Sequence, residues 1–189
     1  MTEIKRALRA LRAGQIIGLP TDTVYGIAAD PFDEAAMAAL FAVKGRTDDK
    51  PIPVLGASRQ DLGTVAVIEG AAASAAVHWP GALTIVVPCA PHAPRWLGNP
   101  VTRTIAVRVP DHPVALALLR RSGPLAVTSA NRSGGPPAID HTAARGILGD
   151  AVAVYLEGEA PGGRSSTVVD LTGPVPVVLR PGPIDWSES

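Results

Sequence analysis

Three basic side chains lie close together in one stretch of the sequence, and their types suit phosphate. Lys44, Arg46 and Lys50 fall within residues 44–50, although the chain has only three lysines. A lysine ammonium offers a mobile point charge and an arginine guanidinium a planar fork of donors, and both match phosphate oxygens. The stretch therefore predicts a triphosphate site. The alternative is a solvated loop in which Lys44 complements the C-terminus of a helix.

Two further polar segments follow apolar runs that are typical of strands. Residues 19–26 read Leu-Pro-Thr-Asp-Thr-Val-Tyr-Gly, and residues 127–135 contain Ser129, Asn131 and paired glycines. Loops that follow strands are where α/β proteins bind ligands, and small hydroxyls with glycines let backbone amides approach an anion. These segments are candidate ligand loops. Ordinary turns built on proline, aspartate, asparagine and glycine are the alternative.

One arginine lies inside a predicted strand. In the run 104–109, Thr104, Ala106 and Arg108 share one face, while the branched residues between them share the other. A guanidinium that faces a sheet surface is costly unless it meets an anion. Arg108 therefore either contacts an anionic group or lies on an exposed edge strand.

Several familiar chemistries are excluded by the sequence. It contains no Gly-Lys pair, hence no Walker A loop, and none of the patterns G-x-G-x-x-G, H-E-x-x-H, C-x-x-C or G-x-S-x-G. Its single cysteine, Cys89, excludes a disulfide framework and a cysteine-cluster zinc site. The four histidines are scattered along the chain, which favours surface or core roles over metal binding. We expect no metal site made by the protein.

The candidate segments need an α/β fold to bring them together. The chain has 189 residues, 47% hydrophobic and 4% aromatic, and its 17 basic side chains balance 17 acidic ones. This composition suits one domain with a real core, expected over residues 1–189, and argues against a general polyanion binder or a base-stacking surface. Apolar and amphipathic runs predict strands at 15–19, 52–55, 83–87, 104–109, 125–128, 151–156, 167–171 and 175–179, and helices at 4–12, 33–43, 69–78, 112–121 and 142–148.

The order of these elements predicts the kind of sheet. Strands alternate with helices, whereas the runs 167–171 and 175–179 are close enough for a hairpin, so the sheet should be mixed. The first helix is amphipathic, and no signal-peptide core or run of about 18 apolar residues follows. We therefore expect a cytoplasmic protein without a membrane segment.

Seven segments occur in the order typical of one family. They read PTDTVYG, KGR, WPGALT, VRVPDHP, TSANRSG, SSTVVD and LRPG, and together they span nearly the whole chain. In this combination the sequence resembles the YrdC-type threonylcarbamoyl-AMP synthase family in its short form. The resemblance implies a twisted, mixed parallel and antiparallel sheet with flanking helices around a basic cavity.

The resemblance also implies a reaction. L-Threonine, bicarbonate and ATP would give threonylcarbamoyl-adenylate and pyrophosphate, and another enzyme would transfer the threonylcarbamoyl group to an adenosine of tRNA. Mg²⁺ would be held mainly by phosphates, and tRNA or the transfer enzymes are further candidate partners. The alternatives are an RNA-binding module and a related protein of another carbamoyl transfer.

Residue roles follow from position within the shared motifs. Lys44 and Arg46 are the expected catalytic residues, because they would offset the repulsion between an anionic nucleophile and ATP. Two residues depart from the family pattern: Leu55 stands where several members have histidine, and Thr47 where many have proline. The resemblance assigns L-threonine to Thr23, Arg108, Ser129 and Ser166, and ATP to Lys44, Arg46, Lys50, Thr104, Asn131 and Arg180.

Overall fold

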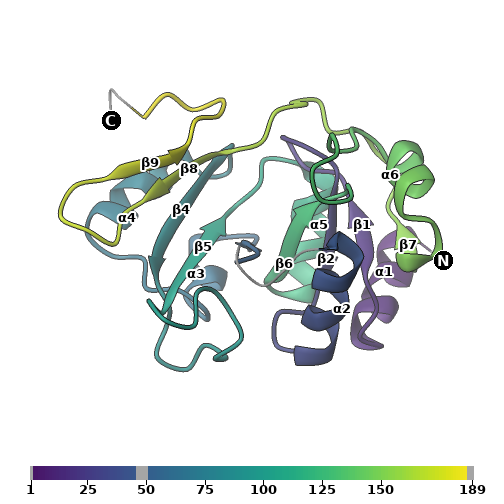
Figure 1. Cartoon of the computed structure of the whole chain (residues 1–189), viewed down its shortest axis with the longest axis horizontal. Helices are drawn as coiled ribbons and strands as arrows, with labels where there is room; N and C mark the ends of the chain where they lie inside the picture. The colour runs from purple at the N-terminus through teal and green to yellow at the C-terminus, as the bar shows by residue number, and fades with distance from the viewer. Residues whose placement is uncertain (1, 46–50, 187–189) are drawn as a thin grey trace.

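A computed structural model of the chain describes residues 2–45 and 51–186. Within these residues nine strands form one open sheet in the spatial order β7-β1-β2-β6-β3-β5-β4-β8-β9. The pairs β1·β7, β3·β5 and β4·β8 are parallel, and the other neighbours are antiparallel. Helices flank the sheet (Figure 1). The prediction of a mixed α/β sheet is confirmed.

The bounds of the elements are as follows. The strands are β1 (Ile17–Leu19), β2 (Gly26–Ala29), β3 (Val54–Leu55), β4 (Leu83–Pro88), β5 (Thr104–Arg108), β6 (Leu125–Ser129), β7 (Val154–Tyr155), β8 (Thr167–Asp170) and β9 (Val177–Arg180). The helices are α1 (Glu3–Arg12), α2 (Glu34–Lys44), α3 (Arg59–Leu62), α4 (Ala71–Ala75), α5 (Pro113–Ser122) and α6 (His141–Leu148), with 3-10 turns η1 (Ala76–His78) and η2 (Gly149–Ala151).

The predicted elements agree with the structure except in short segments. β2 was not predicted, because its Gly-Ile-Ala-Ala sequence has little strand preference and is held in place by pairing with β1 and β6. α3 was not predicted either. The predicted strand 151–156 is reduced to β7, and the predicted helix 69–78 divides into α4 and η1. The predicted hairpin of β8 and β9 is confirmed, with a register shift in β8.

Helices cover both faces of the sheet over β1, β2 and β6. α1 and α5 pack together on one face, where Leu8, Leu11 and Leu118 belong to one apolar cluster. α2 packs on β2 at the other face, through Met37 and Leu40. Figure 1 shows α2 in front of these strands with α1 and α5 behind them. This half of the sheet is therefore a closed three-layer core.

The other half of the sheet has one apolar face and one polar face. Ile85, Val107 and their neighbours are buried in the core, as the alternation in β5 predicts. The opposite face carries Thr84, Ala106 and Arg108, and Leu55 of β3 is the register partner of Arg108. The face of the sheet that α5 covers over β1, β2 and β6 is the same face that carries these residues. Over β3, β4 and β5 it borders a cavity instead of a helix.

Local interactions fix the ends of α2, which lead into the candidate site. Asp33 caps its N-terminus, accepting from the backbone N–H groups of Ala35 and Ala36 at 3.0 and 3.1 Å. Gly45 follows its last residue with φ of 59°, a left-handed conformation that favours glycine. The helix therefore stops at Lys44 and turns the chain there.

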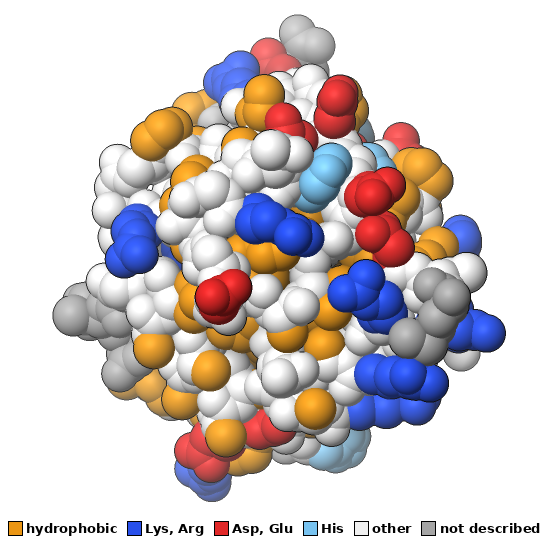
Figure 2. Space-filling view, turned by 90° about the vertical axis from the view of Figure 1, so that its right-hand side faces the viewer, with side chains coloured by type: hydrophobic (Ala, Val, Ile, Leu, Met, Phe, Trp, Pro, Cys, Tyr) orange, Lys and Arg blue, Asp and Glu red, His pale blue; other side chains and the backbone are white. Residues whose placement is uncertain are grey.

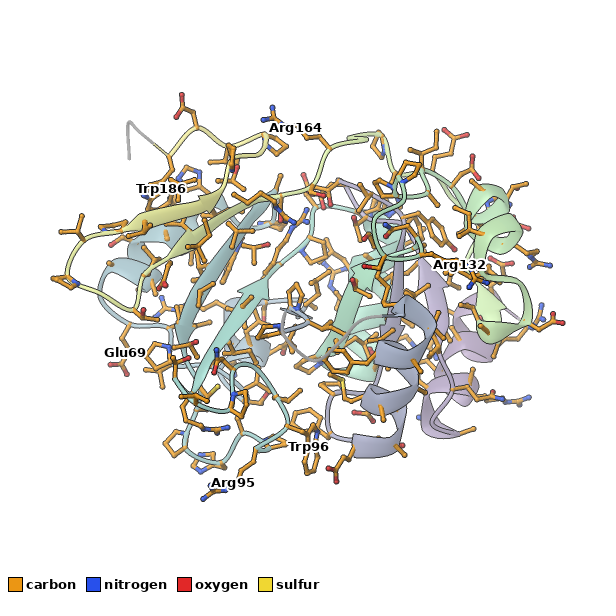
Figure 3. The ribbon with its side chains drawn as sticks, in the orientation of Figure 1. Glu69, Arg95, Trp96, Arg132, Arg164 and Trp186 are labelled. Atoms are coloured by element: carbon orange, nitrogen blue, oxygen red, sulfur yellow. The ribbon has the colours of Figure 1, made fainter. Side chains whose placement is uncertain are left out.

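Two surface features lie outside that region. Trp96, in the loop between β4 and β5, donates from Nε1 to the Pro31 carbonyl at 3.0 Å and joins the two halves of the molecule (Figure 3). The exposed side of α1 carries its four cations, Lys5, Arg6, Arg9 and Arg12. Figure 2 faces this end of the molecule and shows Lys and Arg side chains gathered toward its right-hand side.

Candidate anion-binding site

Arg108 is the most constrained charged residue of the site. It lies at the end of β5 between β3 and β4 and is 5% exposed, so the edge-strand alternative is wrong. Nε donates to the Gly81 carbonyl at 2.8 Å, Nη1 to Thr23 Oγ1 at 2.9 Å, and Nη2 to Asp22 Oδ1 at 2.5 Å, an ion pair. A guanidinium has five N–H bonds. These partners therefore leave two of them for a ligand.

Burial and charge act on Arg108 in opposite directions. Removal from water lowers the pKa of its guanidinium, because desolvation penalises the charged form, and the Asp22 carboxylate counteracts this. The positive charge of Arg180 lowers that pKa further. Since arginine stays protonated in proteins, Arg108 and Arg180 are two positive charges that repel each other across the site. An anionic ligand would relieve this repulsion.

Threonine hydroxyls before β2 form a directed chain of hydrogen bonds. Thr23 Oγ1, which accepts from Arg108, lies 3.0 Å from Thr21 Oγ1, and Thr21 Oγ1 donates to the Val24 carbonyl at 2.7 Å. A hydroxyl has a single proton, so Thr23 must be the donor to Thr21. The remaining capacity of Thr23 Oγ1 is therefore that of an acceptor, fixed in direction by its neighbours.

Lys44 ties the end of α2 to the loop after β6. It is 1% exposed, and its ammonium donates to the Ser129 carbonyl at 2.7 Å, the Asn131 carbonyl at 2.7 Å and Asn131 Oδ1 at 2.6 Å. Ser129 Oγ donates to the same Oδ1 at 2.6 Å, and Asn131 Nδ2 donates to the Gly135 carbonyl at 2.6 Å. The solvated-loop alternative is therefore wrong for Lys44, whose ammonium organises this loop.

A third cluster joins β4, β8 and β9. Ser166 Oγ lies 2.8 Å from Thr84 Oγ1, and Arg180 donates to Ser166 through Nε to the carbonyl at 3.0 Å and Nη2 to Oγ at 3.2 Å. The chain approaches closely here, because a Cβ at Gly182 would collide with the backbone nitrogen of Thr167. Glycine after Pro181 is thus required for Arg180 to lie over Ser166.

These clusters surround one cavity of about 260 Å³. It has the size of a small metabolite site rather than one that encloses a whole nucleotide. Its lining residues come from segments far apart in the sequence, and five of the ten predicted site residues are among them: Thr23, Arg108, Ser129, Ser166 and Arg180. The predicted basic cavity thus has Arg108 and Arg180 as its charged side chains among the described residues.

The other predicted residues lie elsewhere. Lys44 and Asn131 contact Ser129 from behind the cavity wall. Thr104 is at the far end of β5 from Arg108, with its hydroxyl 2.8 Å from that of Thr102. Arg46 and Lys50 lie outside the described residues, as does Thr47.

Some residues of the site were missed or only partly recognised from sequence. Asp22 and Thr21 lie within the segment 19–26, but their contacts with Arg108 and Thr23 depend on β5 lying beside that loop. Leu55 lines the cavity and places an apolar side chain beside Arg108. Arg132, in the segment 127–135, and Arg164, directly before the SSTVVD motif, lie at the outer surface (Figure 3).

The described residues contain no group of three or more His, Cys, Asp or Glu side chains that could hold a metal ion. In the same part of the chain, no helix has the length and apolar character that crossing a bilayer needs.

An open, mixed sheet with a cavity at its polar face, lined by Arg108 and Arg180, defines the structural class of this protein. The sequence profile of the Sua5, YciO and YrdC proteins, which carries the description telomere recombination, matches residues 9–182. The chain therefore belongs to the Sua5/YciO/YrdC family, as its motifs predict.

Individual relatives extend this result. A Mycobacterium tuberculosis protein, provisionally named a threonylcarbamoyl-AMP synthase, is 50% identical over 96% of this chain and 84% of its own length. The threonylcarbamoyl-AMP synthase of Pyrococcus abyssi is 39% identical over 98% of this chain, which spans only 56% of it. The crystal structure of P. abyssi Sua5 complexed with L-threonine superposes with a TM-score of 0.89 at 37% identity, over 96% of this chain and 55% of that one.

Proposed function

We propose that this protein is an L-threonylcarbamoyladenylate synthase, which condenses L-threonine, bicarbonate and ATP to threonylcarbamoyl-AMP and pyrophosphate for tRNA modification in the cytoplasm. The observation that carries the proposal is the convergence of Thr23, Arg108, Ser129, Ser166 and Arg180 on one small cavity. Relatives named for this activity, and a related structure with L-threonine bound, support it.

The cavity suits the amino acid. The two remaining N–H bonds of Arg108 can form a bidentate pair with the threonine carboxylate, since the guanidinium is already fixed by three other contacts. Ser166, Thr23 and Ser129 add hydroxyl groups around the same space. Their positions are set before the substrate arrives, which lowers the entropy cost of binding.

ATP would bind beside the amino acid, near Arg180. In this proposal Arg46 and Lys50 act on the phosphates, while Lys44 and Asn131 hold the loop that contains Ser129 and Lys44 adds its positive charge from behind that loop. ATP is long enough to extend along β5 toward Thr104. Mg²⁺ would be held mainly by the phosphates and would neutralise their charge. No cluster of protein ligands among the described residues competes with that arrangement.

The reaction needs alignment more than covalent help. The amine of threonine and bicarbonate give the N-carboxylate and water, and a carboxylate oxygen then attacks the α-phosphorus as pyrophosphate leaves. Nucleophile and electrophile are both anionic, so cations such as Arg180, Arg46 and Lys44 would reduce their repulsion. This is why the site needs no nucleophilic side chain.

The test is to incubate the full chain with ATP, L-threonine, bicarbonate and Mg²⁺ and to measure pyrophosphate release and the adenylate by mass spectrometry. We expect both products, and neither when threonine or bicarbonate is omitted. Folded protein that forms no adenylate would overturn the proposal and favour an RNA-binding module or another carbamoyl transfer, which RNA binding and carbamoyl phosphate turnover would then distinguish.

A further inference from the structure

The cavity poses an electrostatic problem for an amino acid. Its charged side chains in the described part of the chain are Arg108 and Arg180, which attract a carboxylate but repel the ammonium group beside it. A zwitterion therefore needs a negative group near the guanidinium that receives its carboxylate.

Asp22 is placed to supply that charge. It lies between Thr21 and Thr23, both of which line the cavity, and it makes the one ion pair within residues 2–45 and 51–186, with Arg108. Its side chain is 16% exposed, whereas that of Arg108 is 6% exposed. Asp22 is not itself a lining residue, but its carboxylate is hydrogen-bonded to Arg108, which is, and it stays partly exposed beside that guanidinium.

The two oxygens of Asp22 are used unequally. Oδ1 accepts from Arg108 Nη2 and from the backbone N–H of Asp111 at 3.0 Å. Oδ2 takes part in no hydrogen bond with the described residues. A carboxylate can accept at both oxygens, so Oδ2 retains its capacity for a further donor.

We propose that Asp22 is a specificity-determining residue that accepts the ammonium group of the amino-acid substrate at Oδ2. Arg108 and Asp22 then form an adjacent pair of opposite charges that recognises the zwitterion, the carboxylate on Arg108 and the ammonium on Asp22. This inference rests on the proposed threonine site. It predicts discrimination against acids of the same shape that lack the amino group.

A purely structural Asp22 would behave differently. If it only orients Arg108, its loss changes the binding of every carboxylate by the same factor. If it also contacts the ammonium, its loss weakens threonine relative to 3-hydroxybutyrate, which has the same carbon skeleton without the amino group. The ratio of the two affinities therefore separates the two roles.

The experiment measures L-threonine and 3-hydroxybutyrate by calorimetric titration against the wild type, Asp22→Asn and Asp22→Glu. Asn retains an acceptor for Arg108 and for the Asp111 N–H but loses the charge. We expect the threonine preference to fall roughly tenfold or more in Asp22→Asn, as the loss of an interaction of about 1.4 kcal/mol produces. Asp22→Glu, which keeps the charge, should retain most of the preference.

Asp111→Asn is the matched control, because it removes an exposed carboxylate next to the same network while its backbone N–H still binds Asp22. Its affinity ratio should equal that of the wild type. An unchanged ratio in a folded Asp22→Asn protein overturns the inference alone. Equal affinity of the wild type for both acids overturns it as well, even if Asp22→Asn does not fold. Absence of threonine binding to the wild type overturns the proposed site too.

Discussion

At the scale of single residues, buried cations define the site. Arg108 and Lys44 are 5% and 1% exposed, and each is surrounded by oxygens of other segments. A buried charge is tolerated only when hydrogen bonds and opposite charges compensate its lost hydration. The contacts of these two side chains therefore bind the loops together as well as shaping the cavity.

The planar fork of Arg108 should be essential for threonine. Arg108→Lys keeps the charge but cannot contact Gly81, Thr23, Asp22 and a ligand at once. We expect threonine affinity to fall tenfold to a hundredfold, about 1.4 to 2.8 kcal/mol, while ATP affinity changes much less. Separate calorimetric titrations check this. Threonine binding as tight as that of the wild type would show that Arg108 is not the carboxylate clamp.

Lys44 should stabilise the folded protein measurably. Lys44→Met removes an ammonium that donates to oxygens of Ser129 and Asn131 and leaves those acceptors buried. Hydrogen bonds to charged groups contribute about 1.5 to 3 kcal/mol, so the free energy of unfolding should fall by that amount. Denaturant titration measures it. The exposed Lys5→Met is the control and should change little, and equal stability of both variants would contradict the contacts seen here.

At the scale of elements, α1 has Glu3 in its first turn and Arg9 and Arg12 in its last turn, which favour a helix, but two other residues at its start do not. Thr2 is the N-cap residue, but its side chain makes no capping hydrogen bond, and Lys5 lies in the first turn. A cation there opposes the helix dipole, and Lys5 also lies one turn before Arg9, a like charge. The packing of Leu8 and Leu11 on α5 compensates for this.

Lys5→Glu should therefore stabilise the protein. Glutamate at this position completes a Thr-x-x-Glu capping box, complements the dipole and pairs with Arg9. We expect a gain of roughly 0.5 to 1.5 kcal/mol and a higher melting temperature. Arg12→Glu, the matched change in the last turn of α1, should lower the melting temperature. Two shifts of the same sign would contradict the dipole argument.

At the scale of the whole molecule, the two edges of the sheet differ. Helices α1 and α6 pack on β7 at one edge, whereas β9 at the other edge is largely exposed. Among the described residues β9 pairs only with β8, and Val175, Val177, Val178 and Leu179 are 69%, 53%, 45% and 57% exposed. The backbone N–H and C=O groups of an edge strand can pair with another chain, and exposed apolar side chains favour that association. The hairpin of β8 and β9 is thus the region of the described surface where self-association should begin.

A charge on this strand should suppress association. Leu179→Lys places a cation on the apolar edge, and we expect less light scattering at high protein concentration than for the wild type. Val101→Lys is the control, because Val101 is 88% exposed but lies in the loop before β5. Equal suppression by both variants would show that net charge, rather than the edge strand, controls association.

The sequence by itself determined the main elements and the family. Runs of Val, Ile and Leu marked most strands, and Asp33 and His112 marked the starts of two helices, because periodicity and caps are local properties. Ordered motifs identified the family, and two of the predicted polar segments, 19–26 and 127–135, contribute residues that line the cavity. β2 was missed because its strand character comes from neighbours on both sides and not from its own residues.

Only the tertiary structure decided how the motifs meet. Arg108 and Asp22 are 86 residues apart, and Lys44 and Asn131 are 87 apart, so their pairing depends on strand order. Sequence spacing gave Arg108 a face of β5 but could not say which anion it would meet. β6 and β3 lie between β2 and β5 in the sheet, and the loop before β2 reaches across them to the end of β5, where Asp22 becomes the partner of a buried guanidinium. Long-range contacts of this kind are set by packing of the whole chain and leave no local pattern in the sequence.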